Sequence, residues 1–158
     1  MSRPLLLIDV DGVISLFGAD QTRRGEVVTT LVDGLPHLLS MRAAAALNGL
    51  ADAFEPVWCT GWEERADEHL PALLGLPRGW PHIRFPDRPE FAAHWKLSGI
   101  DAYAGARPLA WVDDAHDPAC RDWARRRSAP TLLVSTEPAT GLTDEHAAQL
   151  RRWAAQLR

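Results

Sequence analysis

Short apolar runs alternate with longer stretches of helical period along this chain. Continuous runs at residues 5–8, 56–59, 109–112 and 131–134 are typical of strands buried on both faces of a sheet, and residues 82–85 form a weaker run. Each run lies too far from the next for a hairpin, so the connections must cross over and the strands pair in parallel. The pattern therefore predicts an α/β fold with a central parallel sheet of about five strands and helices on both faces.

Helix start and stop signals lie between and after these runs. Three polar residues stand where a helix N-cap is expected: Ser40, Asp117 and Thr143. Pro56 should close the first helix, and the helix that follows residue 61 should end near Gly75, with Pro71 kinking or restarting it. The signals predict four helices, each joined to a strand of the sheet.

Residues 15–39 do not follow this alternation. A polar stretch leads into the β-branched run at residues 27–32, the turn-like pair Asp33-Gly34 follows, and residues 35–39 are again largely apolar. A turn of this kind between two such runs predicts a β-hairpin flap over about residues 15–39. Because the chain holds no repeat, low-complexity tract or linker, we expect one domain over residues 1–158 without a large cap.

The composition is that of an ordinary globular domain. Of the 158 residues 46% are hydrophobic, and the formal net charge is −4. This charge argues against a general nucleic-acid coat or a membrane-surface binder, which usually carry a basic excess, but it allows a specific nucleic-acid substrate. The apolar run at residues 5–8 stops at Asp9, so we expect neither a signal peptide nor a membrane span, and a cytoplasmic location.

Cysteine and lysine are both scarce. Cys59 and Cys120 have neither metal-ligand spacing nor a disulfide framework, so we expect them to be reduced and packed. Of the 17 basic residues only Lys96 is a lysine, and the others are arginines. The preference for arginine and alanine indicates a GC-rich bacterial genome. It also favours a compact charge site for Lys96, because arginine and lysine are interchangeable at most surface positions.

Polar side chains follow three of the predicted strands. Asp9 and Asp11 come after the first strand, Thr60 after the second, and Asp113 and Asp114 after the strand at 109–112. Since ligands of open parallel sheets bind beyond the carboxyl ends of the strands, these side chains should share one rim. Four carboxylates would repel one another unless a cation compensates them, and ligation by oxygen alone points to Mg²⁺ rather than zinc.

The motifs in their order along the chain resemble those of the haloacid dehalogenase-like (HAD) hydrolases. They are Leu-Leu-Leu-Ile-Asp9-Val-Asp11-Gly-Val, Thr60 after an apolar strand, Lys96, and Trp-Val-Asp113-Asp114. The resemblance spans nearly the whole chain and implies a three-layer Rossmann-like fold. The sequence contexts of Thr60 and of the Asp113-Asp114 pair are most similar to small capless HAD domains, including those associated with RNA-repair proteins.

The resemblance also implies a role for each residue in phosphoryl transfer. Asp9 would be the nucleophile that forms an aspartyl-phosphate, and Asp11 the acid that protonates the leaving oxygen and then activates water. Thr60 and the backbone N–H groups of Gly61 and Trp62, at the start of a helix, would bind the phosphate. Lys96 would neutralise charge on the phosphoryl group and on Asp9.

The implied cofactor is Mg²⁺. The metal ligands would be Asp9, the backbone carbonyl of Asp11, and one carboxylate of the Asp113-Asp114 pair. We favour Asp114 as the direct ligand and Asp113 as its support, although the sequence leaves the choice between them open.

The resulting expectation is a Mg²⁺-dependent phosphohydrolase acting on a phosphate monoester. Two alternatives stay open: a catalytically silent HAD-fold binding module, and a phosphatase for polynucleotide ends in nucleic-acid repair. The partner is accordingly a phosphorylated small molecule or a nucleic-acid phosphate end, and we expect no membrane partner. A homo-oligomer that covers the open rim would also fit the sequence.

Overall fold

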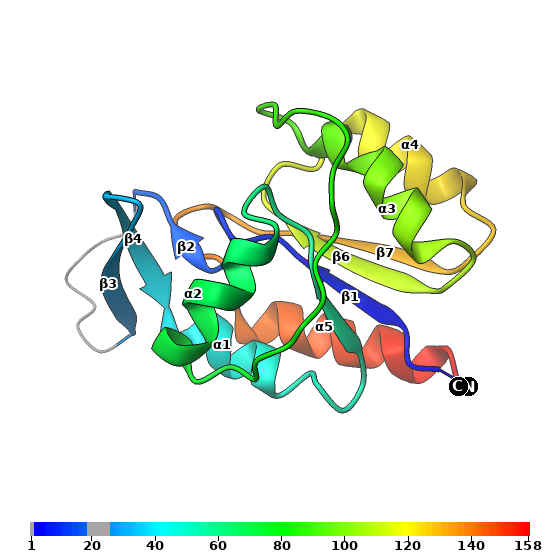
Figure 1. Ribbon diagram of the computed structural model, residues 1–158. Coiled ribbons are helices and arrows are strands. Elements are labelled where there is room, and N and C mark those ends of the chain that lie inside the picture. Colours follow the sequence, from blue (N-terminus) through cyan, green and yellow to red (C-terminus); the bar gives the residue numbers. More distant parts are fainter. Residues whose placement is uncertain (1, 19–25) are drawn as a thin grey trace.

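A computed structural model describes residues 2–18 and 26–158 and has a three-layer α/β architecture (Figure 1). Its central sheet has the strand order β5-β1-β6-β7, and all three neighbouring pairs are parallel. The strands are β1 (Leu5–Ile8), β5 (Glu55–Trp58), β6 (Leu109–Asp113) and β7 (Thr131–Ser135). The predicted α/β fold with a parallel sheet is confirmed.

Both faces of the sheet are covered because side chains alternate along each buried strand. Leu6 and Ile8 of β1 pack into one apolar core, and Leu5 and Leu7 pack into the other. The first core contains residues of α1 (Met41–Asn48), α2 (Glu64–Leu74) and α5 (Asp144–Gln156). The second contains residues of α3 (Leu97–Ala104) and α4 (Pro118–Arg126), which lie together on the opposite side in Figure 1.

The described part of the sheet has four strands, so the expected fifth strand at residues 82–85 is wrong. That segment makes only an isolated bridge, in which Ile83 donates to the carbonyl of Trp58. Pro81 and Pro86 flank it, and neither has a backbone N–H with which to extend a ladder.

The predicted N-caps are confirmed at Ser40, Asp117 and Thr143, whose side chains each accept a hydrogen bond from a backbone N–H of the first helical turn. Other boundaries differ from the expectation. α1 ends at Asn48 instead of near Pro56, and α2 continues through Pro71 as one helix. Gly75 then ends α2 in the left-handed region, as predicted. None of the described helices has the length and hydropathy needed to cross a membrane.

The expected hairpin is present as β3 (Val27–Val32) and β4 (Leu35–Ser40), joined at Asp33-Gly34. Both turn residues have positive φ, 51° and 78°, as a two-residue hairpin turn of matching twist requires. A short strand β2 (Ser15–Leu16) pairs with the other edge of β4, which makes a three-stranded antiparallel sheet. Residues 19–25 of the predicted flap lie outside the described residues.

Candidate active site

The register of the sheet brings the chemically important residues to one rim. Ile8 pairs with Trp58 and with Val112, so the residue that follows each strand position stands at the same level. These residues are Asp9, Cys59 and Asp113. Hydrogen bonds from the N–H of Asp9 to Val112 and from that of Cys59 to Ile8 fix this level. Lys96 reaches the rim from the end of a short 3-10 helix, η1 (Ala93–Lys96).

The ammonium group of Lys96 is held by three oxygen atoms. Its Nζ lies 2.6 Å from Oδ2 of Asp113 and 3.1 Å from Oδ1 of Asp9, and it donates to the carbonyl of Cys59 at 2.9 Å. The Lys96 side chain is only 4% exposed. Burial alone would lower the pKa of Lys96, but the charges of Asp9 and Asp113 raise it above its ordinary value. The amine is therefore a fixed positive charge.

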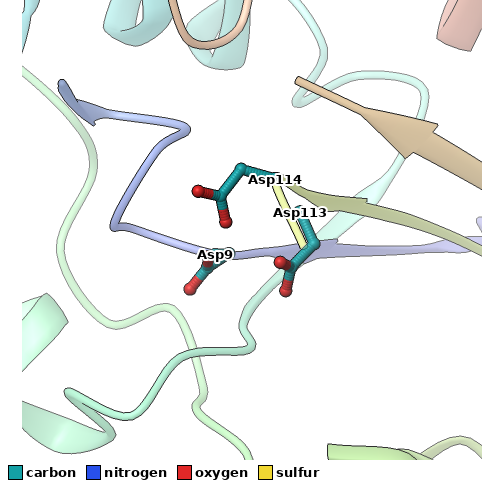
Figure 2. A group of neighbouring side chains, drawn as sticks. All are labelled: Asp9, Asp113 and Asp114. Atoms are coloured by element: carbon teal, nitrogen blue, oxygen red, sulfur yellow. The ribbon is translucent and has the colours of Figure 1, made fainter. Parts of the chain in front are cut away.

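Three carboxylates meet beside this amine. Oxygen atoms of Asp9, Asp113 and Asp114 lie within 4.8 Å of one another, and Figure 2 shows the three side chains gathered at the ends of β1 and β6. Burial raises the pKa of Asp9 well above its usual range, although Lys96 opposes the shift. Burial and the charge of Asp113 raise the pKa of Asp114 to about 6. Such a cluster has an excess of negative charge that a divalent cation would offset.

The donor set fits Mg²⁺, because it consists of carboxylate oxygens alone. Both oxygens of Asp113 already have protein donors: Lys96 on Oδ2, and the N–H of Ala115 on Oδ1 at 3.0 Å. Asp114 is half-buried and packs directly on Gly12, where an added Cβ would lie 2.1 Å from its Oδ2. Gly12 also has a φ of +78°. Both the close approach of Asp114 and this left-handed backbone conformation therefore require glycine here.

Asp11 lies on the same side of the sheet and contacts the turn after β5. The indole Nε1 of Trp62 donates to Oδ2 of Asp11 at 3.2 Å. Oδ1 of Asp11 is buried and has no hydrogen-bond partner among the described residues. One oxygen of this carboxylate is thus held by the protein, while the hydrogen-bonding capacity of the other is unused among the described residues.

Thr60 and Gly61 form a tight turn rather than the start of a helix, because α2 begins at Glu64. The Thr60 hydroxyl is buried and accepts from the N–H of Trp62 at 3.2 Å, and the Thr60 carbonyl accepts from Glu63 at 3.0 Å. The expectation that Gly61 and Trp62 stand at the start of a helix is therefore wrong. The turn itself presents Gly61 to the cleft.

An open cleft of about 250 Å³ is lined by Gly61, Lys96 and the four aspartates of the rim. The acidic residues and Lys96 line one side of the cleft, and the segment 89–93 forms the wall on the other. The sequence patterns did not indicate this segment. The N–H of Ala93 donates to the carbonyl of Ala115, and His94 binds Glu90 and Asp117, so this wall is attached to the start of α4. The ring of Phe91 is fully exposed at the cleft. No sequence motif could reveal the wall, because its residues meet the site only through the path of the chain.

Comparisons with known proteins identify a matching family. The model of a family described as "HAD domain in Swiss Army Knife RNA repair proteins" matches residues 5–147. A search among curated proteins finds no match. One solved crystal structure aligns with 98% of this chain and 81% of its own, at 22% sequence identity and a TM-score of 0.42.

Proposed function

The chain belongs to the family of HAD domains in Swiss Army Knife RNA repair proteins, and we propose that it is a Mg²⁺-dependent phosphatase that uses Asp9 as its nucleophile. The observation that carries the proposal is the buried amine of Lys96 between Asp9 and Asp113. Burying three charged side chains is costly, and such groups cluster at functional sites. The common position of Lys96, Asp9 and Asp113 at the rim therefore indicates an active site.

In the proposed reaction an oxygen of Asp9 attacks the phosphorus and the ester P–O bond breaks. Asp11 gives its proton to the departing oxygen, so that the leaving group departs as a neutral alcohol. Water then attacks the phosphorus of the aspartyl-phosphate, Asp11 takes up the water proton, and Asp9 is released with inorganic phosphate. Lys96 stays charged throughout and offsets negative charge on Asp9 and on the phosphoryl oxygens.

We infer that Asp9, Asp114 and the backbone carbonyl of Asp11 would hold the Mg²⁺. When bound, the ion would offset the charge of the phosphate and orient it. Asp113 would serve as support behind these ligands, because its two oxygens already accept from Lys96 and Ala115. This arrangement supports Asp114 as the direct ligand of the acidic pair.

For the substrate we propose the phosphate end of a polynucleotide. The RNA-repair context of the family favours this class over phosphorylated small molecules. The open cleft would admit a phosphate carried by a large molecule, and the exposed ring of Phe91 offers a surface on which a base could stack. A binding module without turnover is the alternative that the experiment must exclude.

The test is hydrolysis of p-nitrophenyl phosphate with Mg²⁺ and with added chelator, in parallel for the parent protein and the Asp9→Asn variant. The amide of the variant cannot attack phosphorus, so we expect turnover to fall at least about a thousandfold while circular dichroism stays unchanged. Retained turnover in this variant would exclude the covalent mechanism. Magnesium binding without turnover of any phosphate ester would favour the binding module.

The same assay defines the substrate class when it is extended to matched panels. One panel contains RNA and DNA oligonucleotides with a 3′ or a 5′ phosphate, and the other contains nucleotides and sugar phosphates. We expect the highest kcat/KM for an oligonucleotide end. A sugar phosphate or free nucleotide that is hydrolysed faster than every oligonucleotide would contradict the polynucleotide assignment and leave the phosphatase assignment intact.

A further inference from the structure

The structure contains a polar contact to Asp11 that the proposed chemistry does not by itself require. We propose that Trp62 is a positioning residue that holds the Asp11 carboxyl group by Oδ2 and so orients Oδ1 for proton transfer to the leaving group. The inference rests on the phosphatase function proposed above. It concerns the indole N–H of Trp62, the carboxyl group of Asp11 and the hairpin residue that packs on the indole ring.

The direction of the hydrogen bond carries the argument. An indole N–H can only donate, so Oδ2 of Asp11 must act as an acceptor toward Trp62 at 3.2 Å. In a protonated carboxyl group the carbonyl oxygen accepts and the hydroxyl oxygen donates. This bond occupies Oδ2 and leaves Oδ1 as the oxygen available for proton transfer in the proposed reaction. That oxygen is buried, has no partner among the described residues and belongs to a side chain that lines the cleft.

The indole is itself held in place by the hairpin. The ring of His37 in β4 meets the ring of Trp62 edge to face, with centroids 4.9 Å apart. Nδ1 of His37 lies 2.8 Å from the hydroxyl of Ser15, and Ser15 forms a bridge with Asp11. From the other side, the backbone N–H of Trp62 donates to the Thr60 hydroxyl. These contacts hold the Trp62 side chain in one position. Without them its ring would extend from the turn into solvent.

The bond has a consequence for catalysis because general acids work only from a defined position. A side chain that rotates freely would present the protonated oxygen to the leaving group for part of the time, and displacement of about 1 Å costs roughly a hundredfold in rate. Fixing Oδ2 leaves Oδ1 free to donate in the first step and to accept from water in the second. Trp62 thereby acts through Asp11 and does not need to touch the substrate.

The test is the Trp62→Phe variant, which keeps an aromatic ring against His37 and removes the donor. The dependence of kcat/KM on the leaving group separates positioning from mere structural support. For an alkyl phosphate, whose alkoxide cannot leave without a proton, we expect a loss of about tenfold or more. For p-nitrophenyl phosphate, whose leaving group needs little protonation, the loss should stay within about threefold. Equal losses on the two substrates would overturn the proposal, as would no loss on either.

The matched control is Trp123→Phe. The indole of Trp123 donates to Asp101 at 2.9 Å on the other side of the sheet, away from the cleft. This variant loses the same kind of bond, so its kcat/KM should change equally little for both substrates. A leaving-group effect in Trp123→Phe as large as that in Trp62→Phe would assign the effect to stability and exclude positioning.

A second readout does not depend on turnover. In ¹H–¹⁵N spectra the Trp62 indole signal, identified by its loss in Trp62→Phe, should shift in an Asp11→Ala variant while the Trp123 signal stays in place. An unmoved Trp62 signal would show that the bond is absent in solution and overturn the proposal. A moved signal in a protein without any phosphatase activity would support the bond and refute the proposed function instead.

Discussion

Two clusters of similar design are built on the short helix η1, and they differ chiefly in exposure. In each, one cationic side chain of η1 lies between two carboxylates. Lys96 lies between Asp9 and Asp113 at 3.1 and 2.6 Å. His94, two residues earlier, lies between Glu90 and Asp117 at 2.9 and 2.7 Å. The distances alone would suggest equivalent ion pairs.

Burial separates their roles. The side chains of the Lys96 cluster are 1–9% exposed, whereas those of the His94 cluster are 21–60% exposed. Exposed pairs are screened by water and salt and contribute little to stability, whereas a buried charge that loses its partner is costly. We conclude that the Lys96 cluster is a charge site with demanding geometry. The His94 cluster is an attachment of segment 89–93 to the start of α4.

Replacement of the buried cation should have the largest effect. In Lys96→Arg the charge is retained, but a planar guanidinium must enter a space that holds a compact ammonium with three oxygen neighbours. We expect kcat to fall about a hundredfold or more, since loss of one preorganised charge contact typically has that effect. The measurement is steady-state hydrolysis of p-nitrophenyl phosphate at saturating Mg²⁺.

His94→Arg provides the corresponding change in the exposed cluster. Because solvent surrounds this side chain, a larger cation can be accommodated, and we expect kcat to stay within about threefold of the parent. An arginine at position 96 that supported full activity would show that the buried site does not require a compact charge. The distinction between the two clusters would then fail.

A second pair of variants compares one carboxylate from each cluster through stability. Asp113→Asn keeps the shape and leaves Lys96 with one charged partner, so we expect the free energy of unfolding to fall by roughly 3 kcal/mol. Asp117→Asn loses a charge as well, but asparagine caps a helix as effectively as aspartate. Its loss should stay below about 1 kcal/mol.

Urea denaturation at one ionic strength measures both variants. Repeating the titration in added salt sharpens the comparison, because screening weakens the exposed contact more than the buried one. If Asp117→Asn lowered the free energy of unfolding as much as Asp113→Asn, the exposed cluster would contribute more to stability than its exposure predicts.

Sequence reasoning foresaw the elements that depend on local signals. The buried run of β1 and the N-caps Ser40 and Thr143 follow from side-chain pattern and helix-end chemistry. Helix α3 was not predicted from the sequence, and it contains Gly99, a poor helix former. The structure gives the reason for this glycine: a Cβ there would lie 2.7 Å from the ring of Phe85. Such a close approach is fixed by tertiary packing and leaves no local signal.

The same limit applies to the site. The strand-end rule and the family resemblance selected Asp9, Lys96 and the Asp113-Asp114 pair, and the structure brings all of them together. The bond from Trp62 to Asp11 and the cleft wall at 89–93 escaped the sequence analysis. Both join segments whose proximity depends on how the loops pass over the rim, which periodicity and motifs do not encode.

The smallest predicted effect is the pH dependence of the exposed cluster. The hydrogen bond to Asp117 is the main cause that raises the pKa of His94 above its ordinary value of 6.5. A raised pKa in the folded state gives stability that is fully present below about pH 6.5 and is lost as the pH rises through the folded value. In His94→Gln this contribution is absent, so the Tm difference between parent and variant should be larger at pH 6 than at pH 8.5.

The Tm difference between the parent and His94→Gln removes the contribution of Asp114. This residue has a pKa of about 6 and titrates in the same range in both proteins. His116 does not interfere, since burial lowers its pKa to about 4. Lys96 stays charged over the whole range, and any titration of Asp9, whose pKa is raised by burial, is common to parent and variant and cancels in the difference. Thermal melts in buffers of equal ionic strength would reveal the effect. A Tm difference that is independent of pH would mean that His94 is held by packing and not by its charge.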